Sequence, residues 1–308
     1  MKVCAACHTD LPKDSYSKKQ WKLDEYQRRC KVCITDNREV QPVTNEIIKS
    51  FDSMYLENIK KKISDEELFK QPPPLDDCPI CFLTLPTFHS GSTYMICCGK
   101  FVCSGCVYAP VYDDQGKKVA DKKCPFCRTP HPTSDKEITE RLITRMDNND
   151  PIAIFNRGCD YRDGICGYQQ DHIKALELYH RAAELGCAKA YCSIGYAYDA
   201  GEGVEVDKKK SKYYLELSAM MGSEAARHDL GMKEEDEGDM ERALKHWMIA
   251  IGDGDAGSLK QIKRLYSNGL ATKEDYTKAL QAYQEYLGEI KSVQRDKAAA
   301  ADEDNRYY

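Results

Sequence analysis

The sequence predicts a multidomain protein, with small cysteine-rich modules in its first half and an all-α array of helical repeats in its second half. The chain has 308 residues, which is enough for two or three domains. Twelve of its 16 cysteines stand in close pairs before residue 130, whereas residues 150–291 lack such clusters and repeat themselves. The first pattern is typical of metal-stabilised modules, and the second is typical of a solenoid.

Most of the paired cysteines follow a Cys-x2-Cys spacing, which in matched sets indicates zinc ligation rather than disulfides or a single redox pair. The chain starts Met1-Lys2-Val3-Cys4, without the apolar core of a secretory signal. No apolar run approaches the length of a membrane span. We therefore expect a zinc-binding protein of the cytoplasm or nucleus.

The net charge of −5 is unevenly distributed. Residues 1–40 carry nine Lys/Arg and six Asp/Glu, and residues 150–308 carry 22 and 29. A basic surplus of this size gives only weak affinity for phosphate groups. Nucleic-acid binding by the first module is therefore the least supported of the functions considered. The acidic second half argues against nucleic acid or an anionic membrane there.

Residues 1–40 contain two Cys-x2-Cys knuckles, which together can supply the four thiolates of one tetrahedral zinc site. The predicted ligands are Cys4, Cys7, Cys30 and Cys33. The insertion between the knuckles contains Leu11-Pro12, Tyr16–Trp21 and, just before the second knuckle, Arg28-Arg29. This pattern resembles a small zinc module of a fungal protein that links RNA interference to heterochromatin. The resemblance implies a module that binds a protein partner.

Residues 41–76 contain no cysteine and are expected to form a helical spacer. Apolar residues recur at helical spacing from Ile47 to Ile63, and Thr44 is a suitable N-cap. This helix is expected to end near Lys62. A second short turn over residues 65–70 then meets Pro72-Pro73-Pro74, which no helix can cross.

Residues 77–132 contain eight cysteines, enough for two sites of four ligands. They stand in the strings Cys78-Pro79-Ile80-Cys81, Cys97-Cys98-Gly99-Lys100-Phe101-Val102-Cys103-Ser104-Gly105-Cys106 and Cys124-Pro125-Phe126-Cys127-Arg128. This order resembles the RING finger, a two-zinc α+β module, in its all-cysteine variant. The resemblance implies interleaved ligation, with one zinc on Cys78, Cys81, Cys103 and Cys106 and the other on Cys97, Cys98, Cys124 and Cys127. With the N-terminal site, three zinc ions per chain are expected.

The pattern departs from the usual RING at Lys100, where a histidine ligand commonly stands and an ammonium group cannot ligate a metal. The all-cysteine variants use a Cys-Gly step ahead of the fifth ligand, as in Cys98-Gly99-x3-Cys103. Cys97 then becomes the third ligand, directly adjacent to the fourth. The alternative is that His89 replaces Cys97 or Cys98.

The RING resemblance implies a ubiquitin ligase, which holds a ubiquitin-charged conjugating enzyme without forming a covalent intermediate. By the same resemblance, Ile80 and Pro125 map to the surface that contacts that enzyme, and Tyr108 to an aromatic position after the sixth ligand. Arg128 maps to the position that hydrogen-bonds both enzyme and ubiquitin, a role that suits a planar guanidinium. The same residue types also suit knuckle packing, so the alternative is a non-enzymatic zinc-stabilised scaffold for protein interactions.

Residues 150–291 are predicted to form four helix–turn–helix units of 32 to 37 residues. Small and aromatic residues recur about 37 residues apart: Ala153, Gly158 and Tyr161 return as Ala190, Gly195 and Tyr198. The later copies are looser, and Lys263 replaces an expected glycine. The segment Tyr198–Val204, with Asp207 ahead of the next helix, resembles the Sel1-like repeat, a longer-looped relative of the tetratricopeptide repeat. That resemblance implies an adaptor solenoid that binds a protein or peptide.

The remaining histidines and cysteines of the second half are predicted to be packing residues. No second ligand stands at metal spacing from His172, His180, His228 or His246. Small side chains pack at the repeat positions held by Cys159, Cys166, Cys187 and Cys192. Residues 292–308 are predicted to be a disordered tail. No hydrolase, kinase or cofactor motif is present, so no independent catalytic domain is expected.

Overall fold

The computed structural model divides the chain into two compact units, Met1–Lys60 and Lys61–Tyr308. It describes residues 2–3, 10–11, 13, 63–87, 91–113, 116–302 and 305–307. In the first unit these residues include one antiparallel pair of short strands, β1 (Lys2–Val3) and β2 (Asp10–Leu11).

Two predictions for the first 62 residues lie outside the described residues. One is the zinc site of Cys4, Cys7, Cys30 and Cys33. The other is the helix expected from Thr44 to Lys62. Both stay predictions.

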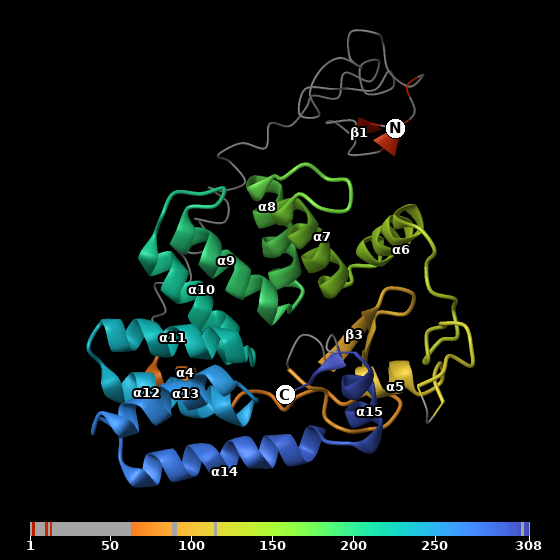
Figure 1. Ribbon diagram of the computed structural model, residues 1–308. Helices are drawn as coiled ribbons and strands as arrows, with labels where there is room; N and C mark the ends of the chain where they lie inside the picture. Colours follow the sequence, from red (N-terminus) through yellow and green to blue (C-terminus); the bar gives the residue numbers. More distant parts are fainter. Residues whose placement is uncertain are drawn as a thin grey trace. The chain divides into compact units, whose positions relative to one another are not determined.

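The second half of the chain forms four consecutive helix pairs, as the repeat pattern predicted (Figure 1). The first two pairs are α7 (Pro151–Asp163) with α8 (His172–Glu184), and α9 (Ala188–Ala200) with α10 (Lys208–Met220). The third and fourth are α11 (Glu224–Asp236) with α12 (Met240–Gly252), and α13 (Ala256–Ser267) with α14 (Lys273–Ile290).

Helix ends coincide with capping residues in the sequence. The side chains of Asp150, Asp171 and Asp207 each accept hydrogen bonds from backbone N–H groups in the first turn of the helix that follows. These bonds satisfy donors that have no partner within the helix. Gly164 and Gly201 end α7 and α9 in the left-handed conformation, with φ of 67° and 77°.

Glycines in the first helix of each of the first three pairs allow the second helix to approach closely. Gly158 faces Tyr179, Gly195 faces Leu215 and Gly231 faces Trp247. A Cβ atom at these three glycines would lie 2.6, 3.0 and 2.3 Å from the opposing side chains. The recurring glycines therefore reflect close helix packing. In α13, the corresponding Lys263 is exposed, which agrees with the looser fourth repeat.

The cysteine-rich segment forms an antiparallel hairpin followed by a short helix. β3 (Ser92–Met95) pairs with β4 (Lys100–Cys103), with Ser92 opposite Cys103, and α5 (Ser104–Tyr108) follows directly. Helix α6 (Asp135–Asp147), capped by Ser134, then leads to the first repeat. The core of this small module contains Cys78, Met95, Val102, Cys103, Cys106 and Cys124.

The predicted turn over residues 65–70 is a short helix fixed against the repeats. Helix α4 (Asp65–Leu68) begins at a capping box on Ser64, and Leu68 is 1% exposed. Asp65 forms an ion pair with Arg242 of α12, and the ring of Phe69 lies 4.7 Å from that of His246. The spacer therefore covers part of the surface of α10 and α12.

The predicted disordered tail over residues 292–308 is wrong for the part that the structure describes. Ser292 caps α15 (Val293–Ala301), and Tyr307 is 1% exposed. Tyr307 packs with Tyr286 and Ile290 at the end of α14. The acidic and alanine-rich composition suggested fraying, but burial of Arg295, Ala298 and Tyr307 orders the segment.

The histidines are packing or surface residues, as predicted. His180 and His246 are buried, and burial lowers the pKa of each to about 3. His172 and His228 are half-buried beside Glu202 and Asp255.

The core prediction for the four cysteines of the repeats holds in part. Cys187 and Cys192 are buried, and Cys159 is half-buried. Cys166 is exposed, because it lies in the loop between α7 and α8.

None of the helices described here is long and apolar enough to cross a membrane.

The tight packing of Gly231 yields a stability test. Gly231→Ala is expected to destabilise the chain by about 1–3 kcal/mol, because the added methyl group overlaps the Trp247 ring. Gly288→Ala is the matched control, since nothing lies within 4 Å of a Cβ there. It is expected to be neutral or stabilising by about 0.5–1 kcal/mol, because alanine favours the helix. Thermal unfolding of the full chain measures both, and equal effects would contradict the packing argument.

Candidate metal centre

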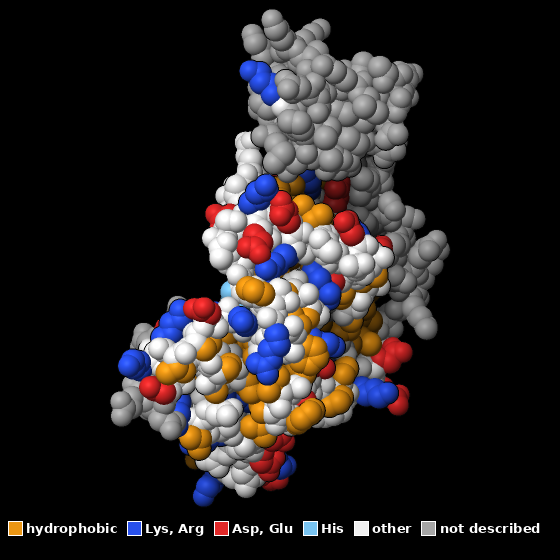
Figure 2. Space-filling view, turned by 90° about the vertical axis from the view of Figure 1, so that its right-hand side faces the viewer, with side chains coloured by type: hydrophobic (Ala, Val, Ile, Leu, Met, Phe, Trp, Pro, Cys, Tyr) orange, Lys and Arg blue, Asp and Glu red, His pale blue; other side chains and the backbone are white. Residues whose placement is uncertain are grey.

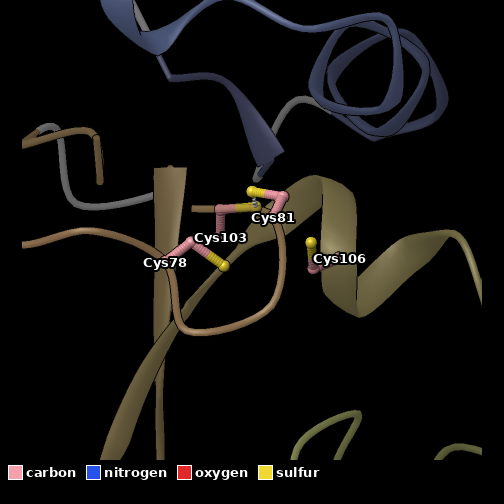
Figure 3. A group of neighbouring side chains, drawn as sticks. All are labelled: Cys78, Cys81, Cys103 and Cys106. Carbon is pink, nitrogen blue, oxygen red and sulfur yellow. Dashed lines mark hydrogen bonds between the residues drawn. The ribbon is translucent and has the colours of Figure 1, made fainter. Parts of the chain in front are cut away.

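The first and third cysteine pairs of the central segment converge on one point. Cys78 and Cys81 come from the first knuckle, Cys103 ends β4 and Cys106 lies in α5, with their sulfur atoms directed toward one another (Figure 3). The four sulfur atoms all lie within 4.8 Å of one another. The Sγ atoms of Cys81 and Cys103 are 3.8 Å apart.

The second and fourth pairs converge separately. Cys97 and Cys98 lie in the turn between β3 and β4, and Cys124 and Cys127 lie in the last knuckle. These four sulfur atoms also lie within 4.8 Å of one another. The distance from Cys98 Sγ to Cys124 Sγ is 3.8 Å, and that from Cys97 Sγ to Cys127 Sγ is 3.3 Å.

Each group has the dimensions of a four-thiolate metal site. A tetrahedron with metal–sulfur bonds of about 2.3 Å has edges of about 3.8 Å. The measured sulfur–sulfur distances of 3.3 to 3.8 Å are close to that edge and far longer than a disulfide bond. Both groups could therefore hold a metal ion.

The protonation of the thiols shows why a cation suits these groups. Hydrogen bonds from Cys103 and Cys106 lower the pKa of Cys78, whereas hydrogen bonds to Cys103 and Cys78 raise the pKa of Cys106. In the second group, burial raises the pKa of Cys97, and it raises the pKa of Cys98 to about 11. Crowding therefore disfavours simultaneous ionisation of the four thiols, and a divalent cation between them would favour their thiolate forms.

Gly99 shapes the turn that presents Cys97 and Cys98. It has a left-handed φ of 71°, and a Cβ atom there would lie 1.7 Å from the guanidinium of Arg145. A glycine is therefore required next to Cys98 both by the backbone and by the packing of α6.

The module is joined to the first repeat through Asp150. The Asp150 carboxylate caps α7 and accepts hydrogen bonds from Arg145 Nη2 at 2.6 Å and Tyr94 OH at 2.8 Å. Burial acts to raise the pKa of Asp150, but these hydrogen bonds outweigh it and hold the pKa below its usual range. One carboxylate thus connects β3, α6 and α7.

The structure brings together the two interleaved ligand sets that the RING resemblance implied. Cys97 and Cys98 both join Cys124 and Cys127, while Lys100 is exposed on β4. The alternative ligand His89 lies outside the described residues.

The predicted partner-binding residues lie on the knuckles. Ile80 is 36% exposed, Pro125 is half-buried, and Arg128 is exposed with a left-handed φ of 66°. Tyr108 stacks on Tyr112, with ring centroids 4.5 Å apart. No hydrogen bond, ion pair or ring contact within the described ranges links Ile80, Pro125 and Arg128 to one another.

Contacts from the far end of the chain were not predicted. Arg295 of α15 reaches Cys81, with its Nη2 atom 3.8 Å from the sulfur. The backbone N–H of Thr87 donates to the hydroxyl of Tyr286 at 3.1 Å. About 200 residues separate these partners, so no spacing rule could pair them.

Comparison with known proteins identifies the helical array. The Sel1 repeat model matches residues 151–187, 188–223 and 264–284, which is less than half of the chain and leaves out the cysteine-rich segment. No protein with a curated description matches the chain.

Three solved structures are similar to the chain. A Sel1 repeat protein from Oxalobacter formigenes is 28% identical, with 55% of this chain and 65% of that chain covered and a TM-score of 0.43. A protective antigen of uropathogenic Escherichia coli strains that displays an SLR fold is 22% identical, covering 56% and 42%, with a TM-score of 0.43. A Pseudomonas aeruginosa protein is 17% identical, covering 52% and 78%, with a TM-score of 0.31. The chain thus spans less than two thirds of the first two proteins. The family-model match shows that the array contains Sel1 repeats.

Proposed function

We propose that this chain is an adaptor-type RING ubiquitin ligase, in which a zinc-loaded RING-like module recruits a ubiquitin-conjugating enzyme and the Sel1 repeats bind a protein partner. The observation that carries the proposal is the interleaving of the two cysteine groups. Each group takes its ligands from alternate pairs along the chain, which is the arrangement that the RING resemblance implies.

Zinc is the metal that best fits the donor set. Four thiolates in a tetrahedron select zinc or an iron–sulfur centre, and hard cations prefer oxygen ligands. The module has few apolar residues besides its cysteines, so it depends on the metals for stability. A structural zinc contributes about 10 kcal/mol or more to folding in small peptides. We propose two zinc ions here and a third on Cys4, Cys7, Cys30 and Cys33.

Exposed apolar side chains on the knuckles support docking of a conjugating enzyme. Phe82 is 76% exposed and Phe126 is 45% exposed, next to the partly exposed Ile80. Figure 2 shows hydrophobic side chains mixed with Lys and Arg over the lower half of the face that it draws. Exposed apolar side chains on one surface suit a protein partner, and the ligase assigns that role to a conjugating enzyme.

Arg128 is placed to contact a partner. Its backbone N–H donates to the carbonyl of Cys124 at 2.9 Å, which fixes the residue directly after the last ligand. Its guanidinium is exposed and makes no hydrogen bond or ion pair with the parts of the chain that the structure describes. A guanidinium that bridges enzyme and ubiquitin holds the thioester in a reactive orientation, which is catalysis by positioning.

The Sel1 repeats supply the surface for a protein partner. Sel1 repeats are interaction modules, and each repeat contacts only its neighbours, which leaves an extended surface free. Part of the surface of α10 and α12 is covered by α4 and Phe69, so the partner is expected elsewhere on the array. Exposed apolar residues of the first two repeats are available for it: Ile165, Ile173, Leu185, Tyr196 and Val206.

The second candidate is a non-enzymatic scaffold, in which the metals only stabilise the module. It shares the metal sites and the repeat surface with the ligase. The two candidates differ only in whether the knuckle surface binds a conjugating enzyme.

Metal analysis tests the sites. The full chain is expected to contain three zinc ions, measured by mass spectrometry of the elements. Cys78→Ser and Cys98→Ser are each expected to lose one zinc, because a hydroxyl is a poor replacement for a thiolate ligand. The exposed Cys166→Ser is the matched control and keeps three. Loss of zinc in His89→Ala with retention in Cys98→Ser would show instead that the histidine is the ligand.

Ubiquitin-chain formation tests the ligase. Full-length protein is mixed with activating enzyme, ubiquitin and a panel of conjugating enzymes. Ile80→Ala and Arg128→Ala are each expected to lower the rate by about tenfold or more, equivalent to roughly 1.4 kcal/mol or more of binding or activation free energy. Ile143→Ala is the control, because Ile143 is a similarly exposed residue on α6. Zinc-loaded protein that forms no chains with any conjugating enzyme supports the scaffold and contradicts the ligase.

A further inference from the structure

Arg295 is a fully buried cation that pairs with no carboxylate of the described residues. The residue lies in α15 and is 0% exposed. Its Nη1 atom donates to the carbonyl oxygens of Ile290 at 2.6 Å and Thr84 at 2.8 Å, and its Nη2 atom donates to the carbonyl of Leu83 at 3.3 Å. No Asp or Glu within the described part of the chain forms an ion pair with it.

The same guanidinium faces the first cysteine group. Nη2 lies 3.8 Å from Cys81 Sγ, within the range for a hydrogen bond to sulfur. In Figure 3 the C-terminal segment, in blue, passes beside Cys81. The arginine therefore approaches the four sulfur atoms from the side of the first knuckle.

The backbone of α15 is in direct contact with the module. A Cβ atom at Gly105 would lie 2.7 Å from the backbone nitrogen of Arg295. The glycine between Ser104 and Cys106 thus allows α15 to lie against α5. The hydroxyl of Ser104 also donates to the carbonyl of Asn305 at 3.4 Å.

A buried cation is costly unless a negative charge compensates it. Carbonyl oxygens supply only partial charges. Four thiolates around one divalent metal carry a net charge of about −2, from two positive and four negative charges. A metal-loaded group of Cys78, Cys81, Cys103 and Cys106 thus supplies the counter-charge that Arg295 otherwise lacks.

The second cysteine group has no equivalent cation among the described residues. Arg145 packs over Gly99, but its Nε and Nη2 atoms donate to the carboxylate of Asp150 at 2.9 and 2.6 Å, which neutralises it. Arg128 and Cys127 are both exposed. The two groups therefore differ in their electrostatic surroundings.

We infer that Arg295 is the outer-sphere partner of the first metal site, so that the last helix of the chain forms part of that metal centre. The inference rests on the proposed metal binding. An N–H donor to a thiolate lowers the charge on sulfur and holds the ligand in place, as outer-shell partners do in other metal sites. The metal at this site is retained through a contact 214 residues away from Cys81 in the sequence.

Zinc release tests the inference in the full-length chain. Protein loaded with zinc is mixed with a chromophoric chelator, and released zinc is followed in time. In Arg295→Met, one zinc equivalent is expected to leave about 10–100-fold faster than in the unaltered chain, with the others unchanged. Alkylation at intermediate times, read by peptide mass spectrometry, is expected to mark Cys78, Cys81, Cys103 and Cys106 before the cysteines of the second group, Cys97, Cys98, Cys124 and Cys127.

Arg227→Met is the matched control, because Arg227 is a second buried arginine without an ion pair among the described residues. It lies in α11, so its loss lowers stability without altering zinc release. Arg295→Lys keeps the positive charge but loses the planar guanidinium with its several N–H donors. It serves as a second test variant if Arg295→Met does not fold. Its release rate is expected to lie between those of the unaltered chain and Arg295→Met.

Cobalt gives a readout that loss of stability does not move. In the cobalt-loaded Arg295→Lys variant, the sulfur-to-cobalt charge-transfer band of one equivalent is expected to shift, while Arg227→Met leaves the spectrum unchanged. If zinc binds at Cys78, Cys81, Cys103 and Cys106 but the zinc release rate and the cobalt spectrum are the same in all variants, the role of Arg295 is overturned while the metal proposal stands. Absence of metal from those cysteines in the unaltered chain would overturn the metal proposal as well.

Discussion

The convergence of eight sulfur atoms into two interleaved groups is the constraint on which the rest of the module depends. The segment from Cys78 to Cys127 has a short hairpin, a short helix and a core made largely of cysteine. Such a core buries too little apolar surface to fix a fold by itself. Interleaving compensates, because each group joins a knuckle to a distant part of the module and so ties the two parts of the segment together.

The Sel1 repeats hold this module from both ends of the array. At the first repeat, Asp150 accepts hydrogen bonds from Arg145 and Tyr94. At the other end, Tyr286 of α14 hydrogen-bonds Thr87, and Arg295 of α15 hydrogen-bonds Cys81. These polar contacts are directional and partly buried, so they favour one docking geometry. A ligase built in this way would present its knuckle surface at a fixed position relative to a partner bound on the repeats.

The chain also uses its own segments to cover the repeats. The spacer places Leu68 and Phe69 on α10 and α12, and Tyr307 closes the end of α14. Tyr307 thus covers the last repeat, whose apolar face has no neighbouring repeat, whereas the spacer packs on the second and third repeats. The covering segments flank the cysteine-rich segment in sequence or in space, so this segment and the repeats belong to one compact unit.

The sequence by itself determined the local features. Cysteine spacing predicted the knuckles, and the RING resemblance of their order implied which sulfur atoms meet. The 37-residue repeat predicted the helix pairs, because Gly158 and Gly195 recur where two helices pack closely. Only the tertiary structure decided that α15 is ordered, that Cys166 is exposed and that Arg295 lies beside Cys81. The physical reason is the separation of the contacting residues along the chain. Cysteine spacing and helical periodicity report only contacts within a knuckle or a helix pair. Burial of a charge against a distant group depends on how the whole chain folds back on itself.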